Sequence, residues 1–175
     1  QPARAGGWLS RRHFPAGCQC HRCPVLYHVD PGLLSNALES YVPETSFWWE
    51  SFVETANQAG VLDNTTLLDA ATADGSYGGQ AEVPLTRYDM AQMMYNLVRE
   101  KGLELPEETK LEAARAAIRD WNEIPEEYQQ AVATCYAWNL LSGGDGGRFD
   151  GASRMTRAQA CVVLSGLLDR VDQMP

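Results

Sequence analysis

Two residue patterns in this 175-residue sequence have the types and spacing to support chemistry. The first is Cys18-x-Cys20-His21-x-Cys23, which places four soft metal ligands within six residues. Zinc accepts these ligands, but structural zinc sites usually combine two such clusters, and no second cluster lies nearby. We therefore interpret the run as part of a disordered leader, a cloning remnant or an unusual gene start, and keep a zinc site as the alternative.

The second pattern is a threonine followed by an arginine, which occurs as Thr86-Arg87 and again as Thr156-Arg157. Threonine is a natural helix N-cap, and an acid or amide follows three residues later (Asp89, Gln159), as in a capping box. An arginine at such a helix start presents a planar set of donors that matches a carboxylate. The free N–H groups and the helix dipole also favour an anion there. Each pair therefore predicts a capped helix start, followed by an arginine that is either solvated or in contact with an anion.

No side-chain combination typical of catalysis stands out. All three histidines lie in residues 1–28, and no Ser-His-Asp, Cys-His or paired-carboxylate pattern is evident. The glycine-rich run 143–147 lacks the Lys-Ser/Thr of a P-loop. Asp145 and Asp150 lack the alternating ligands and closing glutamate of an EF-hand. We expect neither an enzyme nor a cofactor.

Charge divides the chain into two parts. The sequence holds 14 basic and 23 acidic residues, a net charge of −9. Residues 1–28 contain four arginines and no acid, so the acidic excess belongs entirely to residues 29–175. An acidic body argues against nucleic-acid binding, which needs Lys and Arg to neutralise phosphates. The composition, 45% hydrophobic without about 18 consecutive apolar residues, indicates one globular domain and no membrane span.

An internal repeat organises the acidic part. Residues 47–62 have apolar side chains at helical spacing, and residues 128–141 repeat that pattern after a shift of 79 positions. A glycine-rich loop follows each helix, at 73–79 and 142–149, and each Thr-Arg pair then begins another helix. Residues 109–118 predict a linking helix that docks beside the second copy. We divide the chain into the basic leader (1–28), a first unit (29–102) and a second unit (103–175).

The second unit resembles an S-layer homology (SLH) domain. Its matching segments correspond to the family's aspartate-containing start, its Gly-Ile-x-x-Gly turn, its Gly-x-Phe segment and its Ile-Thr-Arg-Ala-Glu helix start. These segments are Ile118-Arg119-Asp120-Trp121, Leu140-Leu141-Ser142-Gly143, Gly147-Arg148-Phe149 and Met155-Thr156-Arg157-Ala158-Gln159. The departures are Asn139 before the turn, Asp150-Gly151 where proline is usual, and Gln159 for glutamate. The first unit is more divergent, and the resemblance covers residues 41–101 and 115–170.

The resemblance implies a fold. It predicts an all-α module of two SLH-type helix–Gly-rich loop–helix repeats with a linking helix, as part of a pseudo-threefold helical bundle. Three repeats commonly form such a bundle, and this chain has two. The third lobe could come from residues 29–45 with the linking helix, from a second chain through self-association, or from sequence that is missing here.

The resemblance also implies a function and a location. Similar proteins are exported by bacteria, and their repeats bind the secondary cell-wall polysaccharide, often through a pyruvylated sugar. We therefore expect non-covalent anchoring of an exported protein at the cell surface. Gly17 to Cys20 fall where the apolar part of a secretion signal should be, so an export signal would lie outside this sequence. The alternative is a helical protein–protein interaction module that keeps the fold without glycan binding.

By position, the family's sugar-binding arginine corresponds to Arg157 and Arg87. For Arg157 we favour binding over a solvated arginine, whereas Arg87 could equally form an internal salt bridge, and the adjacent Asp89 could weaken its groove. The predicted glycan-binding residues are Arg157, Thr156, Arg87, Trp121, Gly146 and Gly147.

Other aromatic and thiol side chains are expected to be structural. Trp49 and Trp138 lie on apolar stripes and predict core positions, whereas Trp121 is expected to be exposed. Cys135 and Cys161 align with alanines of the first unit, so we expect buried free thiols. A disulfide between two facing helices is the alternative in an exported protein.

Overall fold

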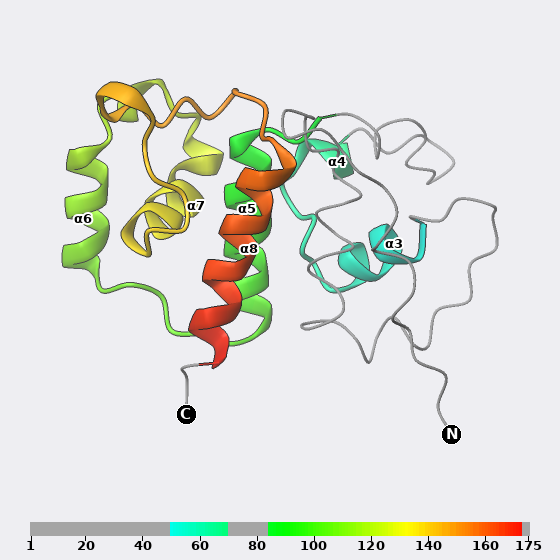
Figure 1. The fold of residues 1–175 in the computed structure, drawn as a ribbon. Helices are drawn as coiled ribbons and strands as arrows, with labels where there is room; N and C mark the ends of the chain where they lie inside the picture. Colours follow the sequence, from blue (N-terminus) through cyan, green and yellow to red (C-terminus); the bar gives the residue numbers. More distant parts are fainter. Residues whose placement is uncertain (1–49, 70–83, 173–175) are drawn as a thin grey trace.

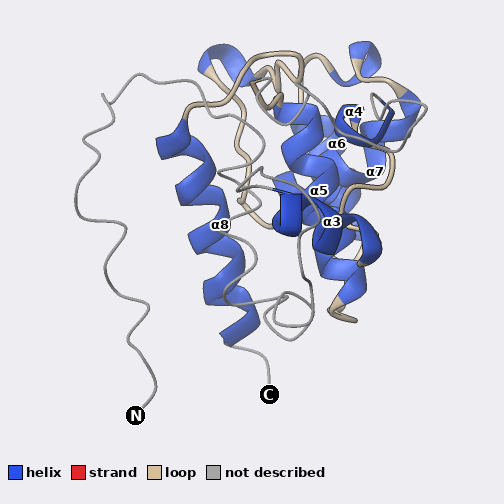
Figure 2. Cartoon of the chain, turned by 90° about the vertical axis from the view of Figure 1, so that its right-hand side faces the viewer, coloured by secondary structure: helices blue, strands red, loops and turns tan. Residues whose placement is uncertain are grey.

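The computed structural model describes residues 50–69 and 84–172. Every regular element in these residues is helical (Figure 1), and Figure 2 shows the same helices joined by loops. The elements are α3 (Glu50–Gln58), α4 (Thr66–Asp69), α5 (Arg87–Glu100), α6 (Glu108–Ala117), η2 (Trp121–Glu123), α7 (Glu126–Ala137), η3 (Asp145–Gly147) and α8 (Arg157–Asp172). The predicted all-α class is confirmed for this part of the chain. Within it, no helix has both the length and the apolar character needed to cross a bilayer.

Helix α5 lies in the middle of the molecule. It packs against α7, and α6 packs against α7, as predicted for the linking helix. Helices α3 and α4 lie on the other side of α5 (Figure 1). Buried apolar residues extend over most of the surface of α5, as expected for a helix enclosed by its neighbours. They are Met90, Ala91, Met93, Met94, Leu97 and Val98.

Helices α3 and α7 end in the same way, at positions shifted by 79. The second residue after each helix end has a left-handed backbone conformation, at Gly60 (φ 70°) and Asn139 (φ 56°). This conformation commonly terminates helices, and glycine and asparagine tolerate it best. Matching backbone hydrogen bonds accompany it, from Val61 N–H to Ala56 O and from Leu140 N–H to Cys135 O, each 2.9 Å long.

The two predicted capping boxes are confirmed. In α5, the Asp89 N–H donates to the Thr86 hydroxyl over 3.1 Å, and Asp89 accepts from the Thr86 N–H in return. In α8, the Thr156 N–H donates to Gln159 Oε1 over 2.9 Å, and the Gln159 N–H donates to the Thr156 hydroxyl over 3.2 Å. These bonds satisfy N–H groups that have no partner within the helix.

The segments that precede α5 and α8 pair with each other. The Met155 N–H donates to Leu85 O over 2.9 Å, and the Tyr88 N–H donates to Gly151 O, also over 2.9 Å. The Tyr88 ring stacks on Tyr128 with centroids 4.8 Å apart. A Cβ at position 151 would lie 1.9 Å from the Tyr88 ring, so this pairing requires glycine where the SLH pattern has proline.

Several sequence predictions concern residues outside the described part of the chain. They include the leader 1–28 with its Cys18, Cys20, His21 and Cys23 cluster, the segment 29–45, Trp49 and the loop 73–79.

Within the described residues, the disulfide alternative is wrong, because Cys135 and Cys161 are both free. Cys135 is buried against Ala91 O at 3.6 Å, and burial raises the pKa of its thiol to about 12. Cys161 is exposed, so the prediction that it is buried is also wrong; the side chain faces away from the core.

The two described tryptophans differ from each other. Trp138 is buried, as its place on the apolar stripe predicts, and the Arg170 guanidinium lies 5.2 Å from the centre of its ring. Trp121 is half-buried and packs against the core, so it is less exposed than predicted.

Candidate functional site

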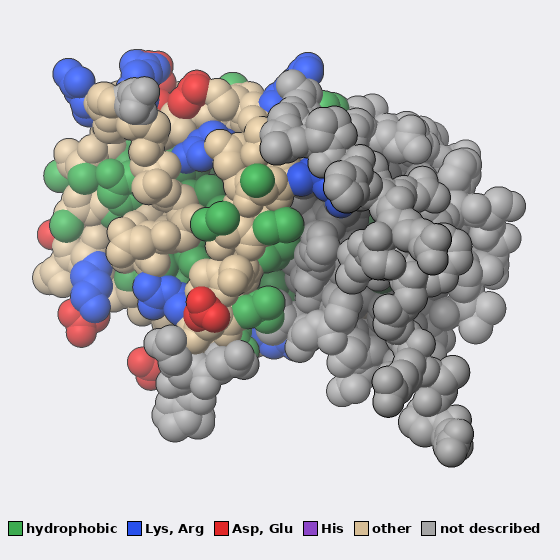
Figure 3. Space-filling view, in the orientation of Figure 1, with side chains coloured by type: hydrophobic (Ala, Val, Ile, Leu, Met, Phe, Trp, Pro, Cys, Tyr) green, Lys and Arg blue, Asp and Glu red, His purple; other side chains and the backbone are tan. Residues whose placement is uncertain are grey.

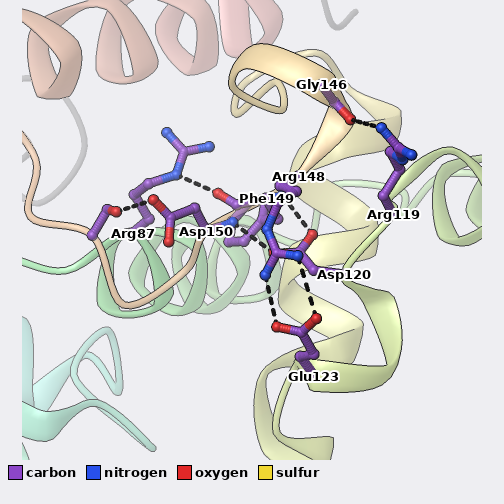
Figure 4. Close-up of polar contacts among 9 residues, drawn as sticks. Arg87, Arg119, Asp120, Glu123, Gly146, Arg148, Phe149 and Asp150 are labelled. Carbon is purple, nitrogen blue, oxygen red and sulfur yellow. Dashed lines mark hydrogen bonds and ion pairs between the residues drawn. The ribbon is translucent and has the colours of Figure 1, made fainter.

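A buried aspartate organises the loop between α7 and α8. Asp120 accepts the Phe149 N–H at 2.6 Å and the Asp150 N–H at 2.9 Å (Figure 4). Burial alone would raise the pKa of Asp120, but backbone N–H groups of Asp150, Phe149 and Asp120 itself, together with Arg148, stabilise the carboxylate. The net result is a lowered pKa. The Asp120 side chain is therefore ionised, and its carboxylate holds the backbone of residues 149 and 150 in place.

Two arginines, Arg148 and Arg119, form additional contacts with the same loop at the surface. Arg148 forms a paired contact with Glu123, with its Nη2 2.7 Å from Oε2 and its Nη1 3.3 Å from Oε1. Arg119 binds the glycine turn, with its Nη1 3.2 Å from Gly146 O and its backbone N–H 3.0 Å from Gly147 O (Figure 4). Gly146 and Gly147 thus close the turn against Arg119.

Arg87 crosses from the first unit to this loop. Its Nε donates to Phe149 O over 2.8 Å, and its Nη2 donates to Ser142 O over 2.7 Å. The guanidinium carbon lies 4.8 Å from the centre of the Phe149 ring. Burial lowers the pKa of Arg87, against the opposing effects of Asp150 and Asp120. Because an ordinary arginine titrates above about pH 12, the group stays charged at neutral pH.

Asp89 is buried and directs its carboxylate away from this arrangement. It accepts the Thr66 N–H at 2.9 Å and the Thr86 hydroxyl at 2.7 Å, so it joins α4 to the start of α5. Among the described residues, Arg87 pairs with the two carbonyls and not with Asp89. The alternative of an internal salt bridge is therefore not what the structure has.

A groove of about 390 Å³ lies beside Arg87. Its walls are the loop 142–144 and the first two turns of α8, which place mainly apolar side chains around one cation. The lining residues are Arg87, Leu140, Leu141, Ser142, Gly143, Gly144, Met155, Ala158, Gln159, Val162 and Val163. Val162 is 71% exposed, and Figure 3 shows hydrophobic side chains reaching the surface in this region, where α8 lies in front. We call this cavity the Arg87 groove.

The predicted glycan-binding residues do not all line the Arg87 groove. Arg87 lines the Arg87 groove, whereas Arg157, Thr156, Trp121, Gly146 and Gly147 are not among its lining residues. Thr156 is the N-cap of α8, and Arg157 is half-buried and engaged in an interaction of its own.

Sequence reasoning missed the Ser142 and Phe149 carbonyls, which hold Arg87 in place. The Leu-Leu-Ser-Gly turn marked this stretch as important. A backbone acceptor, however, leaves no sequence signal that identifies its partner 55 or 62 positions away.

Residues 117–161 match the family model of the S-layer homology domain. The match runs from the end of α6 through α7 and the glycine-rich loop into α8. The S-layer homology resemblance that the sequence motifs predict is therefore confirmed for this segment. Domains of this class are modules that attach proteins to bacterial cell surfaces and bind cell-wall polymers. No curated protein and no solved structure matches the chain.

Proposed function

We propose that this chain anchors an exported bacterial protein to the cell wall by binding a pyruvylated secondary polysaccharide in the Arg87 groove. The observation that carries the proposal is the fixed position of the Arg87 guanidinium. Two carbonyls and an aromatic ring hold it at the wall of a solvent-open groove. Because the cation is oriented before binding, little side-chain entropy is lost when an anion arrives.

The guanidinium keeps donors available for a ligand. Its internal bonds use Nε and one N–H of Nη2, and Nη1 has no hydrogen-bond partner among the described residues. A pyruvyl ketal carries a carboxylate that matches such a planar set of donors. The apolar side chains of Leu140 and Val162 suit the C–H faces of a sugar ring.

The negative charge near the groove means that long-range attraction does not contribute to binding of an acidic glycan. Asp120 and Asp150 lie close enough to raise the pKa of Arg87, and the body of the chain is acidic. The protein as a whole therefore does not attract an acidic polymer, and local donors must hold it. Salt is expected to weaken binding only modestly, since the contact is short-ranged and partly buried.

The way Arg87 is held supports two SLH-type repeats within a larger pseudo-threefold bundle. Arg87 belongs to the first unit, and its carbonyl partners belong to the second. By the same arrangement, Arg157 of the second unit would use the loop of a further unit. Such a unit would come from residues outside the described part, from a second chain, or from a longer protein.

The Arg87 groove favours binding over catalysis. In the part of the chain that the structure describes, Arg87 is the one charged side chain among its lining residues. General acid–base catalysis needs a titratable group near the reacting atoms. We therefore propose a binding module and not an enzyme.

The test is calorimetric titration with purified pyruvylated wall polysaccharide. Arg87→Ala should weaken binding about 10- to 100-fold, the effect of losing a charge-assisted hydrogen bond. Arg87→Lys should recover only part of the affinity, because the planar fork is lost. Arg115→Ala is the matched control, since Arg115 pairs with Glu108 on α6.

An absence of binding by the wild type would reject the anchoring proposal and favour a protein–protein interaction module. Binding that survives Arg87→Ala would reject the groove alone.

A further inference from the structure

A second cavity, of about 380 Å³, lies where the turn after α3 meets α5 and α7. Gln92, Tyr95 and Asn96 of α5 line it, with Gln130 of α7 on another side. No residue of α8 or of the loop 142–150 is among its lining residues, so it is separate from the Arg87 groove. We call this cavity the amide pocket. Its size lies within the range of about 300–1,000 Å³ that is typical of ligand sites.

Buried amides fix the base of this pocket. The Asn96 Nδ2 donates to Val61 O over 3.0 Å and to Asp63 O over 2.8 Å. The Gln92 Nε2 in turn donates to Asn96 Oδ1 over 2.9 Å. These hydrogen bonds connect the turn after α3 to the central helix α5, and they orient both amides.

One acceptor in this series of hydrogen bonds has no donor in the described part of the chain. Gln92 is 4% exposed, and its Oε1 is buried without a hydrogen-bond partner among the described residues. Buried polar atoms in native proteins nearly always have a partner, so an exception beside a cavity indicates a group that enters from it. A hydroxyl or an amide N–H would satisfy this oxygen.

The charges at the pocket disfavour an acid. Asp63, Glu100 and Glu127 line it against a single cation, Arg99, whose guanidinium lies 5.9 Å from the centre of the Tyr95 ring. The half-buried Tyr95 ring offers an apolar face with a polar edge. Amides, carboxylates and an aromatic ring together suit a ligand with several hydroxyls and no negative charge.

We propose that the amide pocket binds an uncharged sugar unit of the cell-wall polysaccharide. This inference rests on the proposed function and adds a second contact to the same polymer: the Arg87 groove holds the acidic unit and the amide pocket holds a neutral one. The amides and carboxylates read hydroxyl groups, and Gln92 Oε1 takes one of their hydrogens.

The test uses the wall polysaccharide after mild acid has removed its pyruvyl groups. Glu127→Trp, an exposed substitution in the first turn of α7, should fill the pocket and weaken binding of this neutral polymer at least tenfold. Glu126→Trp adds the same bulk one residue away, outside the pocket, and should leave the affinity unchanged. In the wild type, titration should shift the side-chain amide NMR signals of Gln92 and Asn96.

The outcomes separate the two proposals. If intact polysaccharide binds in an Arg87-dependent manner while the neutral polymer neither binds nor shifts the amide signals, the pocket assignment is overturned and the anchoring proposal stands. If Glu127→Trp weakens binding of the neutral polymer but Arg87→Ala leaves binding of the intact polymer unchanged, only the assignment of the Arg87 groove is overturned. If neither polymer binds, both proposals fail.

Discussion

The two Thr-Arg helix starts share a local sequence pattern but differ in their surroundings. Asp89, the capping acid of α5, is fully buried and also binds Thr66 of α4. Gln159, at the equivalent position of α8, is exposed and bonds to Thr156. The same capping box thus serves the interior of the molecule at one helix and its surface at the other.

The arginines of the two pairs differ in the same way. Arg87 reaches the loop of the second unit, which follows it in the chain, and becomes fixed there by Ser142 O and Phe149 O. Arg157 starts the last described helix, and the described residues include no later unit to receive it. Arg87 therefore lines a groove whose other walls come from the second unit.

The largest expected effect tests the two capping residues. Asp89→Ala should lower the free energy of unfolding by about 3 kcal/mol, because it leaves several partly buried N–H and hydroxyl donors of Thr66 and Thr86 without their acceptor. Gln159→Ala should cost about 0.5–1 kcal/mol, as for an exposed cap. Urea denaturation followed by circular dichroism measures both. Equal losses would remove the distinction between a buried and a surface cap.

A second prediction concerns the contact between the units. Gly151→Ala should cost about 2–3 kcal/mol, because its Cβ would overlap the Tyr88 ring and force the paired segments apart. Gly144→Ala is the control, since the nearest atom to its Cβ, Arg148 O, would be 3.9 Å away. Thermal unfolding of the two variants provides the comparison. Similar midpoints would show that Tyr88 moves aside at little cost.

The third prediction ranks the two arginines. Arg87→Ala should weaken polysaccharide binding at least tenfold, whereas Arg157→Ala should change it less than threefold in this chain, about 0.6 kcal/mol. Titration calorimetry on both variants under one buffer condition gives the ranking. The reverse order would support Arg157, which the sequence pattern favours, and would point to a groove completed by a further unit.

The smallest effect is a pH dependence centred on Asp120. Its pKa is lowered in the folded protein, so the unfolded state binds the proton more readily. The stabilisation is therefore complete above the unfolded pKa of about 3.9 and is lost as the pH falls through the folded value. Asp120→Asn should reduce stability by about 1 kcal/mol at pH 7 and by less at pH 3. A difference from wild type that stays constant between these pH values would contradict the role of the carboxylate charge.

Local features of the fold could be predicted from the sequence. The capping boxes at Thr86 and Thr156, the linking helix and the burial of Trp138 follow from spacing of three or four residues along a helix. The SLH resemblance of the second unit is likewise carried by short motifs, and the family match at residues 117–161 agrees with it.

Features of the candidate site could not be predicted in the same way. The sequence predicts that Trp121 is exposed and that Cys161 is buried, and both predictions are wrong. They fail because a local pattern does not show which side of a helix is covered by a segment distant in the sequence. The amide pocket was missed altogether. Gln92 and Asn96 look like ordinary polar positions of α5 until the turn at residues 59–64 is placed against them.

The sequence by itself determined the main helices, the two capping boxes and the S-layer homology motifs of residues 117–161, because these depend on residues a few positions apart. Only the tertiary structure decided which arginine lines a groove. Arg87 and its partners are separated by 55 and 62 positions, and those partners are backbone carbonyls that every residue has. Side-chain identity cannot specify such contacts; the packing of one unit against the next does.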